Sequence, residues 1–371
     1  MKFNTQQSDL LKALIDVSKV VPTRTTLPIL SCALFEANED NLKIRSTDLE
    51  QTIIIKIKAS VIETGKVAVP INKMLEIVSA LKNSNIEFSS VENEVEINSE
   101  NGLYKIPNKD YSEYPDLPEL QTTQKITLTN TEFLNIINNT AYAVSKDDLK
   151  PALCGVYLNI EENKATAVAT DGHRLVKYEK KIETVLPEKI SIIIPAKFLN
   201  IIKNSLDIKG VVNINISENH IDLVQNEKYL LSRIIKETFP DFNSVIPENN
   251  PIKTRVNSKK ILESVKRVSI FSNKTTKQIQ LSFTENELTV LTEDKESSSS
   301  GKEYIECDHK GEKIDTRYNS QYLSEAISHI NTKEVDIYLS SSQTAAVFKP
   351  TEEKEGSNHT ALLMPLRSNN V

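Results

Sequence analysis

The sequence predicts an α+β fold made of three equivalent domains in one chain, each with two helices packed on antiparallel sheets. Three observations predict it. An apolar stripe at helical spacing occurs three times, each time after a short segment of alternating apolar residues. An aspartate follows each stripe in register, at Asp48, Asp171 and Asp294. A second strand-to-helix passage and a polar-tipped hairpin then follow in the same order in every copy, which indicates an internal repeat.

The first helix of each copy is predicted from its apolar stripe. Ser8, Thr131 and Ser258 are the predicted caps, because a short hydroxyl side chain accepts a hydrogen bond from the free N–H groups that open a helix. A helix that lies on a sheet buries one face and leaves the other free. The stripes are Leu10, Leu11, Leu14, Val17 and Val21 in the first copy, Phe133, Leu134, Ile137 and Val144 in the second, and Ile261, Leu262, Val265 and Val268 in the third.

The second helix of each copy follows a strand, in KVAVPINKMLEIVSAL, SIIIPAKFLNIIKNSL and DTRYNSQYLSEAISHI. Each copy closes around a similarly placed proline, at Pro115, Pro240 and Pro365. The stretches YSEYPDLPELQTTQ and FPDFNSVIPENNP are rich in proline and aspartate, so they are the expected boundaries. The predicted domains are residues 1–122, 123–250 and 251–371.

Composition narrows the function classes. The 371 residues are 39% apolar and 26% charged, which is ordinary for a folded soluble chain. A formal net charge of -6 excludes a strongly basic nucleic-acid binder, although not a local basic face. The three cysteines lie far apart, so neither a disulfide framework nor a zinc knuckle is encoded, and no cofactor is expected. The opening residues turn polar at once, without an apolar signal segment or membrane span, so we expect a cytoplasmic protein with no membrane partner.

A chain of three similar domains has repeated interfaces, and a head-to-tail repeat whose rotation closes gives a ring. The free helix faces carry several basic residues. If these helices line the inside of the ring, their basic faces would form a positively charged inner wall. Such a wall would hold DNA through its phosphates without reading the base sequence. The basic residues are Lys259, Lys260, Lys266 and Arg267 on the third copy's first helix, with Lys73 and Lys197 at the start of the second helix in copies one and two.

The chain resembles the bacterial sliding clamp family, the beta subunit of DNA polymerase III, over its whole length. The resemblance rests on the opening MKF with LLKAL, on Arg24 followed by TLPIL, on ATDGHRL at 169–175, on FPDF at 239–242 and on MPLR at 364–367. It implies DNA-clamp domains that form half of a closed ring, in a homodimer around duplex DNA. Such a ring tethers the replicative polymerase as a processivity factor in DNA replication, has no chemistry of its own and is placed on DNA by an ATP-driven clamp loader.

The resemblance also implies site residues. Partners are expected to dock a short peptide, Gln and Leu followed by an apolar residue and Phe, between the second and third domains. Arg24, Lys73 and Lys197 match DNA contacts of the family, and Ile270 and Phe271 match its dimer interface. The positions that match the peptide groove are Leu153, Thr170, Gly172, His173, Arg174, Leu175, Pro240, Val245, Asn319, Tyr322, Leu362, Met364, Pro365, Leu366 and Arg367.

Other interpretations remain open from the residues alone. Asp171 and His173 could belong to a metal-dependent or hydroxyl-dependent hydrolase, or Asp171 could simply form a turn, as the equivalent Asp48 and Asp294 would. The chain could also be a repeat scaffold that binds proteins without encircling DNA. It departs from the family pattern where Asn243 and Ser244 follow the FPD turn, because many relatives carry arginine there.

Overall fold

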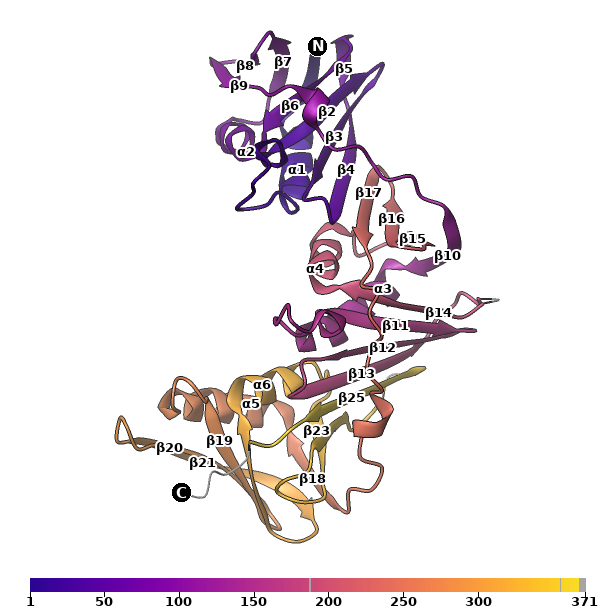
Figure 1. The fold of residues 1–371 in the computed structure, drawn as a ribbon. Helices are drawn as coiled ribbons and strands as arrows, with labels where there is room; N and C mark the ends of the chain where they lie inside the picture. The colour runs from indigo at the N-terminus through magenta and orange to yellow at the C-terminus, as the bar shows by residue number, and fades with distance from the viewer. Residues whose placement is uncertain (187, 354, 367–371) are drawn as a thin grey trace. The chain divides into compact units, whose positions relative to one another are not determined.

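The computed structural model of the chain describes residues 1–186, 188–353 and 355–366 (Figure 1). The first copy contains β1 (Lys2–Gln6), α1 (Gln7–Ser18), η1 (Pro28–Ser31), β2 (Cys32–Asn38), β3 (Asn41–Thr47), β4 (Gln51–Lys58), β5 (Ser60–Glu63), β6 (Gly65–Pro70), α2 (Ile71–Ala80), β7 (Asn85–Val91), β8 (Glu94–Ser99), β9 (Gly102–Pro107) and η2 (Tyr111–Glu113). The second contains β10 (Thr122–Thr129), α3 (Asn130–Thr140), η3 (Ala141–Ala143), η4 (Pro151–Leu153), β11 (Gly155–Glu161), β12 (Lys164–Thr170), β13 (Arg174–Lys181), β14 (Ile190–Pro195), α4 (Ala196–Ser205), β15 (Val211–Ser217), β16 (His220–Gln225), β17 (Lys228–Arg233) and η5 (Asn243–Val245). The third contains β18 (Ile252–Asn257), α5 (Ser258–Val268), η6 (Ser269–Phe271), β19 (Gln278–Phe283), β20 (Glu287–Asp294), β21 (Ser299–Lys310), β22 (Ile314–Asn319), α6 (Ser320–Ser328), β23 (Glu334–Leu339), β24 (Ala346–Pro350) and β25 (Ser357–Leu363).

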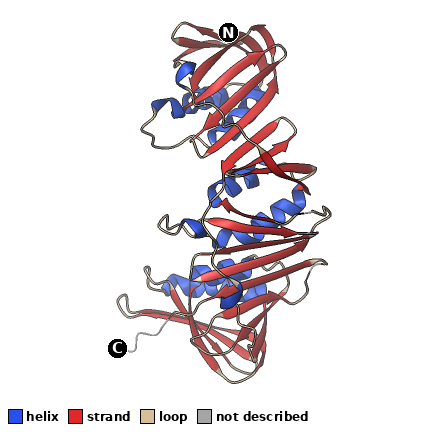
Figure 2. Cartoon of the chain, turned by 45° about the vertical axis from the view of Figure 1, so that its right-hand side comes forward, coloured by secondary structure: helices blue, strands red, loops and turns tan. Residues whose placement is uncertain are grey.

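The order of these elements confirms the predicted repeat. Each copy has a strand, a helix, a group of strands, a second helix and three final strands, and the first copy differs by the extra strand β5. Helices α1 and α2 contact each other, as do α5 and α6 (Figure 2). Among the described residues, no helix is long and apolar enough to cross a membrane.

Antiparallel sheets run across the boundaries between copies. One sheet of eight strands has the order β10-β15-β16-β17-β4-β3-β2-β6, so β17 of the second copy pairs with β4 of the first. A sheet of twelve strands, β14-β11-β12-β13-β25-β24-β23-β18-β21-β20-β19-β22, joins β13 of the second copy to β25 of the third. A sheet of five strands, β5-β1-β7-β8-β9, completes the first copy. The chain forms two compact units, residues 1–131 with 197–234, and residues 132–196 with 235–371.

The central positions of the predicted apolar stripes form the core. Val21 and Val144 were placed on the helices wrongly, because α1 ends at Ser18 and α3 ends at Thr140, and both valines are half-buried. Equivalent positions of α1, α3 and α5 are fully buried in all three copies, for example Leu10, Phe133 and Ile261. The predicted caps were wrong by one or more residues for α1 and α5. The N-cap of α1 is Gln6, which makes no side-chain cap bond, and that of α5 is Asn257, whose side chain accepts from the Lys260 N–H at 3.0 Å.

The junction between β13 and β25 buries a histidine. His359 is 7% exposed, faces Tyr178 across the strand pair and has an Nε2 atom with no hydrogen-bond partner. Desolvation by burial, with a smaller contribution from the charge of His329, lowers the pKa of His359 from 6.5 to about 4. Protonation of this ring therefore opposes pairing of the second copy with the third.

This histidine predicts acid sensitivity. Because the unfolded chain binds the proton more tightly, stability is full above pH 6.5 and falls by up to about 3 kcal/mol as the pH drops to about 4. Urea unfolding at several pH values measures the effect in the intact chain, and His359→Phe should show a shallower loss over that pH range. Equal pH dependence in the two proteins would contradict the assignment.

Candidate functional site

A turn built from threonine and aspartate occurs twice, between β3 and β4 and between β12 and β13. In the first, Asp48 Oδ1 accepts from the Gln51 N–H at 2.7 Å. In the second, Asp171 Oδ1 accepts from the backbone N–H groups of His173 and Arg174 at 2.9 and 3.0 Å. The interpretation of these aspartates as turn-forming residues is therefore confirmed.

The residue after each aspartate has a left-handed backbone. Leu49 has φ 79° and Gly172 has φ 89°. The space around Gly172 is open, since a Cβ there would meet no atom within 4 Å. Glycine therefore fits this position through its backbone conformation, and its missing side chain leaves the turn uncovered.

An apolar cavity of about 180 Å³ lies beside the second turn. Its floor includes Leu175 of β13 and Leu362 of β25, which are paired in register, while Val245 and Met364 keep 45% and 42% of their side chains exposed. Exposed apolar side chains around a concave surface are typical of binding sites. The cavity is lined by Leu153, Thr170, Gly172, Arg174, Leu175, Pro240, Asp241, Phe242, Val245, Leu362 and Met364.

The cavity brings together residues from the second and third copies that the groove prediction named, and it adds two. Asp241 and Phe242 are new, and both belong to the FPDF segment from which only Pro240 was selected. Asp241 Oδ1 accepts from the Asn243 N–H at 3.1 Å, which begins the short η5 helix. The Phe242 and Tyr157 ring centroids are 6.0 Å apart.

The remaining predicted groove residues lie outside the cavity lining. His173 and Tyr322 have ring centroids 6.2 Å apart. Asn319 caps α6 by accepting from the Gln321 and Tyr322 N–H groups at 3.0 and 3.3 Å. Pro365 and Leu366 continue from Met364, whose N–H donates to the His173 carbonyl at 2.9 Å. Arg367 lies outside the described residues.

Arg174 links the cavity to the third copy. Its side chain is 8% exposed and donates from Nη2 to the Tyr142 carbonyl at 2.7 Å, from Nε to Asp171 Oδ2 at 3.2 Å and from Nη1 to Glu325. The guanidinium also lies 4.4 Å from the Tyr322 ring centroid. The guanidinium is thus committed to acceptors within the protein, and it positions the turn and α6 around the cavity.

The same contacts set the charge of Glu325. Burial opposes ionisation of this carboxylate, but hydrogen bonds from Arg174 and Gln321 outweigh it and lower the pKa of Glu325. Burial also raises the pKa of the Tyr142 phenol well above its usual value. These groups hold fixed protonation states near neutral pH, which suits a structural network.

The geometry does not favour the hydrolase interpretation. Both oxygens of the Asp171 carboxylate already accept hydrogen bonds, from backbone N–H groups and from Arg174. Among the described residues, no group of three or more His, Cys, Asp and Glu side chains is placed to hold a metal ion. A metal-assisted mechanism needs several convergent ligands.

The predicted DNA contacts lie within one compact unit and on its surface. Arg24 is exposed in the loop between α1 and η1. Lys73 pairs with Glu76 at 3.0 Å, and Lys197 pairs with Asp48. The Lys73–Glu76 pair is exposed at both ends and contributes little stability, so exchange of its carboxylate for a phosphate costs little, whereas the Asp48 side chain is only 10% exposed.

The predicted interface residues are exposed in the single chain. Ile270 is 75% exposed and Phe271 is 41% exposed. Phe271 packs over Gly301 of β21, where a Cβ would approach the ring to 2.8 Å. A glycine at this position therefore makes room for the phenyl ring.

Comparison with known proteins identifies the family. Three successive domains of the DNA polymerase III beta subunit match the chain: the N-terminal domain over residues 1–118, the central domain over 127–241 and the C-terminal domain over 243–367. The chain belongs to the DNA polymerase III beta subunit family. It is 26% identical over 368 residues to the beta sliding clamp of Chlamydia pneumoniae, with 99% of each chain covered.

Solved structures of this family share the fold. The sliding clamp of Bartonella birtlesii bound to griselimycin matches with a TM-score of 0.94 and 25% identity, covering 99% of this chain and 100% of that one. The sliding clamp of Bacillus subtilis matches with a TM-score of 0.93 and 23% identity, covering 99% of both chains. As a DNA polymerase III beta subunit, the chain is a DNA sliding clamp, a non-catalytic processivity factor.

The Arg174 network predicts that lysine is a poor substitute in this clamp. Lys retains the charge, but its three donors all lie on one nitrogen and cannot reach the acceptors that the separate Nε, Nη1 and Nη2 atoms of Arg174 reach, so Arg174→Lys should destabilise the protein by about 2 to 4 kcal/mol. Urea unfolding measures the loss. Arg317→Lys is the matched control, because Arg317 donates from Nε to the neutral Gln280 Oε1 at 3.2 Å, and it should lose less than about 1 kcal/mol. Equal losses in the two variants would contradict the positioning role.

Proposed function

We propose that two copies of this chain join head to tail into a closed ring around duplex DNA and tether the replicative polymerase and other peptide-bearing partners to it. The ring acts in the cytoplasm after a clamp loader has placed it on DNA. Domain boundaries near residues 122 and 250 fit the starts of β10 and β18. The observation that carries the proposal is an unmatched strand edge at each end of the repeat.

The repeat predicts which edges meet. The last strand of the second copy, β17, pairs with β4 of the first, and the last strand of the third, β25, pairs with β13 of the second. β4, β13 and β21 are equivalent strands of the first, second and third copies. By the same rule, β9, the last strand of the first copy, is expected to pair with β21 of a third copy. Within one chain, β9 and β21 belong to different sheets and do not pair. A second chain can bring its β21 to the β9 of the first.

Both strands have a free side among the described residues. β9 is an edge strand that pairs only with β8. Residues 299–306 of β21 pair with β20 on one side, and only residues 307–310 of β21 pair with β18. Large apolar side chains lie on these edges: Leu103 on β9 is 55% exposed and Tyr304 on β21 is 61% exposed, and η6, which carries the exposed Ile270, contacts β21. Unpaired main-chain groups and exposed apolar surface favour association through these strands.

Contacts to DNA in this proposal are weak and independent of sequence. Arg24, Lys73 and Lys197 supply cations for phosphate on exposed side chains. A closed ring stays on DNA through topology, so tight adhesion is unnecessary and a net charge of -6 is compatible with a DNA partner.

Partner proteins are proposed to bind the apolar cavity. Leu175 and Leu362 form a floor suited to aliphatic or aromatic anchors, and Val245 and Met364 expose apolar surface at its rim. The Bartonella birtlesii clamp was solved bound to griselimycin. A short peptide with leucine and phenylalanine anchors fits the chemistry of this cavity.

The ring predicts a topological signature. After loading onto nicked circular DNA, the protein should be retained and should be released when the circle is cut. Ile270→Asp places a charge in the proposed seam, so it should weaken dimerisation about 100-fold or more and abolish retention. Sedimentation and gel filtration with DNA measure both effects.

Ile208→Asp is the matched control, because Ile208 is 76% exposed and Ile270 is 75% exposed. The control should remain dimeric and retained. A monomeric parent protein, or retention on DNA that does not depend on the circle, would refute the ring.

The peptide proposal predicts a selective loss. Val245→Asp adds a charge at the cavity rim, so affinity for a peptide ending in Gln-Leu and an apolar residue followed by Phe should fall about tenfold or more. Fluorescence anisotropy with a labelled peptide measures it. Val185→Asp, at a 69% exposed valine away from the cavity, should bind as the parent does. If Val245→Asp bound the peptide as tightly as Val185→Asp does, the peptide would bind outside the apolar cavity.

A further inference from the structure

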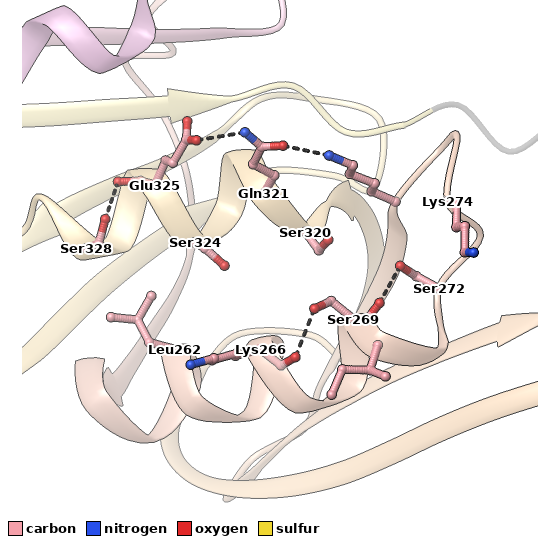
Figure 3. A pocket seen from close by; sticks show the side chains of 12 residues that line it. Leu262, Lys266, Ser269, Ser272, Lys274, Ser320, Gln321, Ser324, Glu325 and Ser328 are labelled. Carbon is pink, nitrogen blue, oxygen red and sulfur yellow. Dashed lines mark hydrogen bonds between the residues drawn. The ribbon is translucent and has the colours of Figure 1, made fainter.

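Two arginines are buried among the described residues, and they differ in their partners. Arg45 of β3 and Arg174 of β13 are each 8% exposed. Arg174 donates to the carboxylates of Asp171 and Glu325. Figure 3 shows that Glu325 also accepts a hydrogen bond from Gln321, so two donors fix this carboxylate. The charge of Arg174 is therefore compensated inside the protein.

Arg45 has no such partner. No described residue forms an ion pair or a hydrogen bond with its guanidinium, and its Nε atom is fully enclosed, whereas Nη1 and Nη2 retain contact with solvent. The guanidinium lies over the Tyr114 ring, with Cζ 5.0 Å from the ring centroid. A ring face attracts a cation, but it does not replace the charge-assisted hydrogen bonds that burial removes. A buried arginine in this state indicates an anion supplied from outside the chain.

The place of Arg45 in the repeat indicates the kind of ligand. Arg45 and Val168 both lie three positions before the aspartate of their turn, so they are equivalent. Val168 packs with Leu175 and Leu362, which form the floor of the apolar cavity. The residue equivalent to Leu175 in the first copy is Thr52. The first copy therefore has a cation and a hydroxyl where the second copy has the apolar floor of its proposed peptide site.

The neighbouring lysines of the first copy fall into two groups. Lys43 and Lys66 pair with Glu36 at 3.0 and 2.6 Å. Burial opposes ionisation of Glu36, but the hydrogen bonds from these lysines outweigh it and lower the pKa of Glu36. Lys109 donates to a backbone carbonyl at 2.9 Å and pairs with no described carboxylate. Lys109 and Arg45 are thus left without an anion.

Tyr114 lies close to both of these cations. Its hydroxyl donates to the Arg45 carbonyl at 3.0 Å and is 3.3 Å from the Cys32 carbonyl. Burial raises the pKa of the Cys32 thiol, and the nearby charge of Lys109 opposes this rise. Two cations without a carboxylate partner therefore act on one small region of the first copy, which suits a ligand with more than one carboxylate.

We propose that Arg45 binds a carboxylate side chain of an acidic peptide segment in a partner protein, with Lys109 as a second cation for the same segment. Nη1 and Nη2 of a guanidinium can donate together to one planar carboxylate. The site is separate from the apolar cavity and does not depend on the ring. Its assignment to a peptide rests on the proposed peptide binding at the equivalent positions of the second copy.

Arg45→Met tests the site, and Lys125→Met is its matched control. Both changes remove one cation from the same eight-stranded sheet, and Lys125 is an exposed residue of the edge strand β10. Anisotropy of fluorescein-labelled hexaglutamate measures binding to the full chain. Arg45→Met should bind this probe about tenfold or more weakly, because a charge-assisted pair of hydrogen bonds is lost. Lys125→Met should bind it as the parent does.

Stability of the free protein is a second readout. Because Arg45 carries an uncompensated buried charge, Arg45→Met should raise the urea midpoint of the unliganded chain by about 0.3 M or more. Lys125→Met should leave the midpoint unchanged. Hexaglutamate should raise the midpoint of the parent more than that of Arg45→Met, because a ligand that binds the folded state stabilises it.

Three results would overturn the proposal. A lower urea midpoint for Arg45→Met would show that the guanidinium is compensated inside the protein. Equal affinity of Arg45→Met and Lys125→Met for hexaglutamate would place the acidic peptide elsewhere. Displacement of hexaglutamate by succinate at the same carboxylate concentration would identify a site for a free carboxylate.

The peptide ending in Gln-Leu and an apolar residue followed by Phe is measured in parallel. Its failure to bind the parent would refute the apolar cavity as a peptide site. Normal binding of this peptide, together with hexaglutamate affinity that does not depend on Arg45, would refute the Arg45 site alone.

Discussion

Main-chain pairing between strands of successive copies is the constraint on which the rest of this clamp depends. The pairs β17 with β4 and β13 with β25 merge separate repeats into continuous sheets. The apolar cavity exists because the second pair puts Leu175 opposite Leu362 and brings the turn at Gly172 next to Met364. If each repeat paired its edge strands within itself, this cavity would not form and no free strand edge would remain through which chains could associate.

Duplication has given equivalent positions different tasks. The same threonine-aspartate turn occurs in the first two copies, with Leu49 in one and Gly172 in the other at a left-handed φ. Only the second lies at the cavity, where the small residue leaves the surface open. The shared fold fixes where a side chain lies, and the residue type decides what that place binds.

Much of the fold could be predicted because the repeat tests every local pattern three times. The stripe of α5, for example, is supported by those of α1 and α3. The predicted caps at Ser8 and Ser258 failed because a hydroxyl alone does not determine where a strand ends, and both helices begin directly after their strands. Most residues that line the apolar cavity were named through family motifs. Phe242 was overlooked within one such motif, and the burial of Arg174 depends on Glu325, 151 residues away, which no local pattern indicates.

The two free strand edges differ from each other, and this has a consequence for how the proposed ring opens. In an isologous dimer, the same surface of each subunit forms one interface, and breaking that interface separates the subunits. In the proposed ring β9 of each chain meets β21 of the other, so the pair has two independent seams. A loader that parts one seam leaves the other as a hinge. DNA can then enter sideways while the two subunits remain joined, and reclosure is an intramolecular event that does not depend on the concentration of free subunits.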